Sequence, residues 1–66
     1  MNIHEVKEFD VVITNRSFID NEDNSKVEEG EVGTIVHLFD DPFYVCVEFN
    51  DGRVRVIHIE YLDRKQ

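Results

Sequence analysis

A twelve-residue acidic stretch, Asp20 to Glu31, carries the side-chain chemistry of a cation site. Oxygen-bearing side chains stand at the first, third, fifth, ninth and twelfth positions of a calcium loop, and Val27 fills the apolar eighth position. However, Ser25 stands where such a loop needs glycine, Lys26 adds a positive charge, and neither flank has helical periodicity. A solvated acidic loop is therefore favoured over a calcium site.

The nitrogen and sulfur ligands of the chain are scattered. His4, His37, His58 and the single Cys46 form no close pair along the sequence, so we expect no structural zinc site. One cysteine also excludes an intramolecular disulfide. The sequence identifies no general base that could activate the Cys46 thiol, so we expect Cys46 to be a half-exposed structural residue. We therefore expect no catalytic residue, no metal and no cofactor.

Arg53 and Arg55 alternate along one segment, and Tyr44 could share their face. Arginines beside an aromatic ring can stack on nucleic-acid bases. The alternative is that both arginines pair with Glu48 across a hairpin and keep the outer face in water. We favour this alternative because the acidic chain repels phosphates.

Alternation and turn residues define the elements that position these groups. The turns are Asp40-Asp41-Pro42, where proline blocks further pairing, and Asp51-Gly52, a strong hairpin signal. The expected strands are Phe9–Thr14, Glu31–Phe39, Phe43–Asn50 and Arg53–Ile59, followed by a short turn and closing strand over Ile59–Leu62.

The clearest strand is Phe43–Asn50, because it alternates without interruption. We expect its Phe/Val side to face the core, with Phe43, Val45, Val47 and Phe49. Gly30 and Gly33 stand where a small barrel needs its backbone to bend or to pass close to itself.

The next strand is harder to orient. We expect Val54 and Val56 to point inward and Arg53 and Arg55 to point outward. The alternation then slips at Ile57, which predicts a β-bulge there.

These elements predict an all-β fold: a small SH3-like barrel of about five antiparallel strands with a short helical turn near the C-terminus. Residues 1–66 form one domain, with a lead-in at 1–8, a long acidic loop at 15–30 and a solvated tail at 63–66. Closing the sheet suits a chain this short, because it encloses a core without long open edges.

The formal net charge of −8 is unevenly distributed. Residues 1–51 carry three basic and thirteen acidic side chains, a balance of −10, whereas residues 52–66 carry four and two, a balance of +2. Such a body disfavours nucleic acid and anionic membranes and favours a basic protein partner. The predicted partner-binding residues are Asp20, Glu22, Asp23, Glu28, Glu29 and Glu31.

Two further expectations concern location and assembly. The chain shows no basic segment followed by an apolar signal stretch, and its apolar runs are too short to span a bilayer, so we expect a cytoplasmic protein. A homodimer would be another way for a domain of this size to add buried area.

Five segments resemble a known family, namely Phe9–Val12, Gly30–Val36, Tyr44–Phe49, Asp51–Gly52 and Tyr61–Leu62. The chain is similar to the small bacterial proteins catalogued as domain of unknown function 4926. The resemblance implies an SH3-like barrel, related in shape to nitrile hydratase β-subunits, and an inhibitory partner of the antitoxin or immunity type. The acidic segment Asp20–Ser25 looks longer than the usual connection in that family.

The leading hypothesis is a non-catalytic, acidic protein-binding module that uses the 20–31 loop or an open sheet edge. One alternative is a nucleic-acid-associated module using Tyr44, Arg53 and Arg55. Another is an accessory barrel that caps a larger enzyme, which predicts an exposed hydrophobic patch.

Overall fold

The computed structural model describes residues 6–65. Within that range the chain forms seven β-strands and one 3₁₀ helix. They are β1 (Val11–Thr14), β2 (Phe18–Ile19), β3 (Lys26–Val27), β4 (Val32–Leu38), β5 (Tyr44–Phe49), β6 (Val54–His58), the 3₁₀ helix η2 (Ile59–Tyr61) and β7 (Leu62–Arg64). The predicted lead-in at residues 1–8 falls largely outside the described residues.

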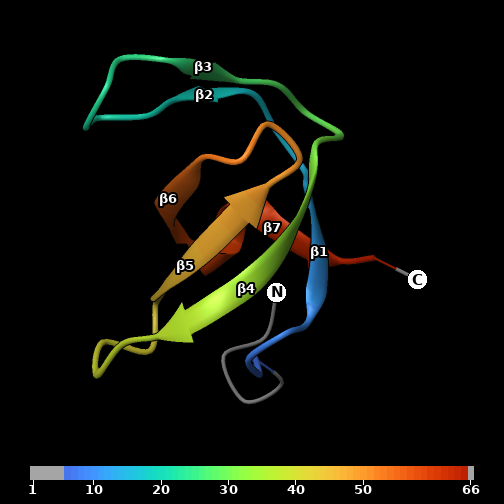
Figure 1. Ribbon diagram of the computed structural model, residues 1–66, viewed down its shortest axis with the longest axis vertical. Coiled ribbons are helices and arrows are strands. Elements are labelled where there is room, and N and C mark those ends of the chain that lie inside the picture. Colours follow the sequence, from blue (N-terminus) through green and yellow to red (C-terminus); the bar gives the residue numbers. More distant parts are fainter. Residues whose placement is uncertain (1–5, 66) are drawn as a thin grey trace.

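Five of the strands form one antiparallel sheet in the order β6-β5-β4-β1-β7. Strands β2 and β3 form a separate two-stranded hairpin. The large sheet is curled, with β4 and β5 in front of β7, and the β2–β3 hairpin extends along one end of it (Figure 1). The predicted small all-β fold with a helical turn near the C-terminus is confirmed.

The core follows the alternation of β5. Val45, Val47 and Phe49 are buried, as predicted. Phe43 is 48% exposed, however, because it precedes β5 and stacks on the ring of His58 instead, with 5.9 Å between centroids. The prediction that Phe43 belongs to the core was wrong.

Two glycines have the roles that the sequence predicts. A Cβ at Gly33 would lie 2.5 Å from Val47 Cγ1, so the backbone of β4 passes too close to β5 for any side chain. Gly30 has φ +90°, a left-handed conformation that suits the turn leading into β4.

The first strand is shorter than expected and begins at Val11. Phe9 is outside it, since its φ of +70° breaks the extended conformation and its side chain is 73% exposed. Val12 and Thr14 are the inward residues of β1.

The segment 15–30 is not simply an exposed loop. It contains the β2–β3 hairpin, in which Phe18 pairs with Val27 and Val27 is fully buried in the core. Buried Thr14 anchors its far end, because the Thr14 hydroxyl donates to Glu28 O (2.7 Å) and accepts from Glu31 N (2.9 Å). Burial of Val27 and packing of Phe18 against the core hold this otherwise polar segment in place.

The orientation predicted for β6 was wrong. Val54 and Val56 are about half exposed on the outer side, whereas Arg55 and Ile57 are buried. Alternation keeps Arg55, Ile57 and the following Ile59 on one side, so burying the two isoleucines carries the arginine inward with them.

The bulge and the tail also differ from expectation. The β5–β6 register runs unbroken through Ile57, and the irregularity lies in β4 between Ile35 and His37. The chain after Leu62 is not a free tail, because β7 continues to Arg64 and pairs with β1.

Candidate functional site

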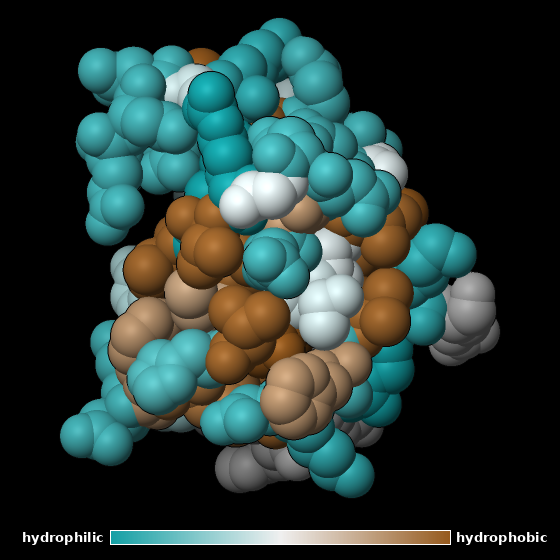
Figure 2. Space-filling model, viewed as in Figure 1, coloured by the Kyte–Doolittle hydropathy of each residue, from teal (hydrophilic) through white to brown (hydrophobic). Residues whose placement is uncertain are grey.

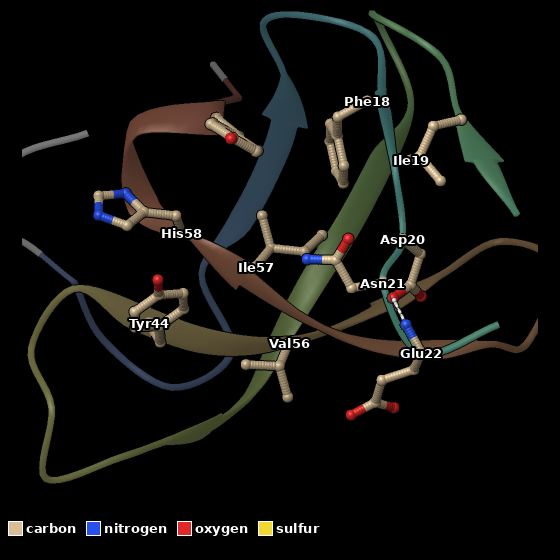
Figure 3. A pocket seen from close by; sticks show the side chains of 10 residues that line it. Phe18, Ile19, Asp20, Asn21, Glu22, Tyr44, Val56, Ile57 and His58 are labelled. Atoms are coloured by element: carbon tan, nitrogen blue, oxygen red, sulfur yellow. Dashed lines mark hydrogen bonds between the residues drawn. The ribbon is translucent and has the colours of Figure 1, made fainter. Parts of the chain in front are cut away.

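A cleft lies between the β2–β3 hairpin and β6, at an edge of the five-stranded sheet. It has a volume of about 290 Å³ and is called the β6 cleft below. Its lining residues are Phe18, Ile19, Asp20, Asn21, Glu22, Tyr44, Val56, Ile57, His58 and Tyr61. Figure 3 shows Asp20 and Glu22 on one side of this cleft and Tyr44 and His58 on the other.

Aromatic rings from four elements form one wall. Tyr44 meets His58 edge to face at 5.1 Å, His58 lies 6.2 Å from Tyr61, and Tyr61 lies 4.9 Å from Phe18. The row is continuous although its members are distant in sequence, because Tyr44 and His58 are directly paired across β5 and β6.

The orientation of His58 follows from its position before η2. Its Nδ1 accepts a hydrogen bond from the backbone N–H of Glu60 at 3.1 Å, as a helix cap does. An accepting Nδ1 places the proton of the neutral imidazole on Nε2. The cap therefore fixes the ring beside Tyr44.

The opposite wall is acidic and shaped by a tight turn. Asp20 Oδ1 accepts from Glu22 N at 3.0 Å, an Asx turn that fixes the backbone of Asp20 to Glu22. The amide of Asn21 points toward the middle of the cleft in Figure 3. The Glu22 charge also reaches β5, since together with burial, the larger cause, it raises the pKa of Cys46.

Arg55 holds this acidic wall against the sheet. Its side chain is 4% exposed, with Nε 3.3 Å from Asp20 Oδ2 and Nη2 3.4 Å from Asp51 Oδ2. Nη2 also donates to Ser25 Oγ at 3.3 Å, and the guanidinium carbon lies 5.2 Å from the Phe49 ring centre. Within residues 6–65, Nε and Nη1 have no aligned hydrogen-bond acceptor. The ion pairs with Asp20 and Asp51 therefore offset most of the free-energy cost of removing the Arg55 charge from water.

A second, exposed pair reinforces the same contact. Arg53 Nη1 lies 3.1 Å from Asp23 Oδ2. Hydrogen bonds from Ser25, with smaller contributions from the charges of Arg53 and Arg55, lower the pKa of Asp23. The backbone N–H of Arg53, followed by Arg55, lowers the pKa of Asp51. Arg53 and Arg55 therefore pair with Asp23, Asp20 and Asp51. They do not pair with Glu48 as predicted, because Glu48 lies opposite Val54 on the outer side.

The predicted acidic residues separate into two groups. Asp20 and Glu22 line the β6 cleft. The others lie outside its lining: Asp23 pairs with Arg53, Glu28 with Lys26 at 3.5 Å, Glu31 Oε2 accepts from Glu28 N, and Glu29 is exposed.

The predicted arginine and tyrosine face is not assembled. Tyr44 is 43% exposed on the outer side of the sheet, whereas Arg55 is buried on the inner side and Arg53 is paired with the hairpin. Arg16 lies 4.9 Å from the Tyr61 ring centre.

Next to the cleft, the outer side of the sheet is unusually apolar. Phe43, Tyr44, Val54 and Val56 are each 43–51% exposed, and we call them the outer apolar face. Figure 2 shows hydrophobic side chains gathered over β4 and β5, beside the hydrophilic end formed by the hairpin. Contiguous apolar surface of this kind marks interaction sites on small proteins.

The described residues contain neither a clustered set of metal ligands nor a membrane-spanning helix. No group of three or more His, Cys, Asp or Glu side chains among residues 6–65 is arranged to hold a metal ion. His37 and His58 lie on strands separated by β5. No helix within residues 6–65 is long and apolar enough to cross a membrane.

The chain matches no protein-family model, and a search of the curated proteins finds no match to it. The resemblance to domain of unknown function 4926 stays a prediction.

Sequence reasoning missed the aromatic half of the site. Phe18, His58 and Tyr61 come from a hairpin, a strand end and a 3₁₀ helix, and no motif links them. One signal was present for Arg55, because the alternation of Ile57 and Ile59 extends backward to it.

Proposed function

We propose that this protein is a non-catalytic binding module that docks a basic protein partner in the β6 cleft. The observation that carries the proposal is the pairing of an acidic wall, Asp20 to Glu22, with an aromatic wall at a sheet edge. Such a cleft next to the outer apolar face offers both charge complementarity and hydrophobic area to a partner.

The net charge supports a basic partner. At −8 the protein attracts a cationic surface over a long range, which accelerates association at low salt. Covering the functional surface of a basic enzyme would make the module an inhibitor. The nucleic-acid alternative loses support, because Arg55 is buried and ion-paired.

A test combines capture of the partner with two matched charge reversals. The tagged protein is used to recover partners from its host at low salt with nuclease present, and the recovered protein is then purified and its binding kinetics are measured. Glu22→Lys changes the cleft, whereas Glu29→Lys makes the same change in net charge outside it. We expect Glu22→Lys to slow association about tenfold and Glu29→Lys to have a much smaller effect.

Equal effects of the two reversals would show that only the overall charge matters and would reject the cleft as the docking site. Capture that is lost with nuclease would reject the protein partner itself.

A second candidate function follows from the outer apolar face. An accessory subunit that caps a larger enzyme would bury Phe43, Tyr44, Val54 and Val56 permanently. This function predicts a constant, salt-resistant complex, whereas binding through the acidic cleft weakens as salt is added.

A further inference from the structure

The β6 cleft has the two components that bind an organic cation. Ring faces attract a cation through their negative quadrupole, and a carboxylate adds a direct charge. Tyr44 and His58 lie on one side of the cleft and Glu22 on the other, as Figure 3 shows. The volume of about 290 Å³ is at the low end for ligand sites, which suits one long side chain better than a folded segment.

Tyr44 is the ring most open to a ligand. It is 43% exposed, and His58 contacts it edge to face, so the edge contact leaves a ring face available. The Tyr61 ring, in contrast, already has the Arg16 guanidinium 4.9 Å from its centre. This internal pair shows that the aromatic row accepts a guanidinium at the distance typical of cation–π contacts.

Glu22 is the carboxylate best placed to meet a ligand charge. Asp20 is occupied, since Oδ2 faces Arg55 and Oδ1 accepts from Glu22 N. The Glu22 side chain is exposed and lines the cleft, and the hydrogen bond from this residue to Asp20 is donated by its backbone N–H. Because Asp20 is engaged in these contacts, Glu22 is the cleft carboxylate that we expect to pair with a cationic ligand.

We propose that the β6 cleft binds the cationic side chain of a lysine or arginine presented by the protein partner. The charge lies between the Tyr44 ring and Glu22, and the aliphatic stem lies against Val56. This inference rests on the proposed function and names the group that the partner inserts.

The test uses small probes, so it does not depend on finding the partner. Nα-acetyl-lysine methylamide and Nα-acetyl-arginine methylamide are titrated into the ¹⁵N-labelled protein, with Nα-acetyl-norleucine methylamide as the neutral control. We expect the cationic probes to shift the amide signals of Glu22, Tyr44 and His58 and to bind on the order of fivefold more tightly than norleucine.

Matched variants separate the contribution of the Tyr44 ring from that of the Glu22 carboxylate. Tyr44→Phe keeps the ring and should bind the probes like the original protein, whereas Tyr44→Leu keeps apolar area without a ring and should lose most of the preference for a cation. Glu22→Gln should weaken cationic probes and leave norleucine unchanged. The amide spectrum of each variant verifies that it is folded.

The outcomes are distinguishable from those of the proposed function. If norleucine binds as tightly as lysine, or no probe shifts the cleft signals while a captured partner still depends on Glu22, this inference fails and the proposed function stands. If the spectrum instead shows a concentration-dependent dimer that covers the cleft, a second copy of the chain is the occupant and the inference is overturned. If the lysine probe binds but a captured partner ignores Glu22→Lys, the docking site in the proposed function fails.

Discussion

Arg55 Nε lies 3.3 Å from Asp20 Oδ2, in a pair whose side chains are only 4% and 10% exposed. This contact joins the edge strand β6 to the residue that follows β2 and so holds the acidic wall of the β6 cleft against the sheet. A buried arginine requires such a partner, because an unpaired charge in the interior is strongly destabilising.

Removing the Asp20 charge should destabilise the fold. Asp20→Asn leaves Arg55 buried beside one carboxylate, Asp51, that is half exposed, and we expect a loss of about 3 kcal/mol of unfolding free energy in urea. Glu29→Gln, an exposed change in the turn after β3, should alter the unfolding free energy by no more than about 0.5 kcal/mol.

The double variant Asp20→Asn with Arg55→Met gives the stricter comparison. It should lose less than Asp20→Asn alone, because methionine removes the buried charge and keeps apolar volume. A larger loss in the double variant would show that Arg55 stabilises the core by packing rather than by its charge.

Acidification should release the hairpin. The pKa values of Asp23 and Asp51 are lowered in the folded state, so each contributes stability above its unfolded pKa near 3.8 and loses it as the pH falls through the folded value. We expect urea stability to decline below about pH 4. In Asp23→Asn this decline should be smaller, and a parallel decline in both proteins would assign the pH dependence to other carboxylates.

Because successive residues of β6 face opposite sides, substitutions at neighbouring positions should differ sharply in their effect on the unfolding free energy. Val56→Thr lies on the outer apolar face and should change the unfolding free energy by no more than about 0.5 kcal/mol. Ile57→Thr places a hydroxyl in the core and should cost about 2 kcal/mol or more. Comparable losses at the two positions would contradict this orientation.

Cys46 should react slowly with thiol reagents. Burial raises the pKa of its thiol, and the Glu22 carboxylate adds to the increase, so little thiolate is present at neutral pH. Iodoacetamide alkylation at pH 8 should be slower than that of a blocked cysteine, and Glu22→Gln should accelerate it. An unchanged rate in Glu22→Gln would place that carboxylate farther from β5.

Much of the fold could be predicted from alternation and turn residues. Val45, Val47 and Phe49 face the core as expected, and Gly33 occupies a close approach between strands. One error arose where a pattern fits two orientations. Val54 and Val56 made one side of β6 look like the core side, and the isoleucines that follow decided otherwise.

The sequence by itself determined the presence of β1, β4, β5 and β6, the turns between β4 and β6, the strongly acidic first 51 residues and the closing turn near the C-terminus. Only the tertiary structure decided which side of β6 is buried and that the acidic loop is held by Arg53 and Arg55. The reason is physical: alternation defines two faces of a strand, but the side that can accept a buried arginine depends on carboxylates elsewhere in the chain. The β6 cleft arises from the same long-range contacts, because its two walls meet only after the hairpin has docked against the sheet.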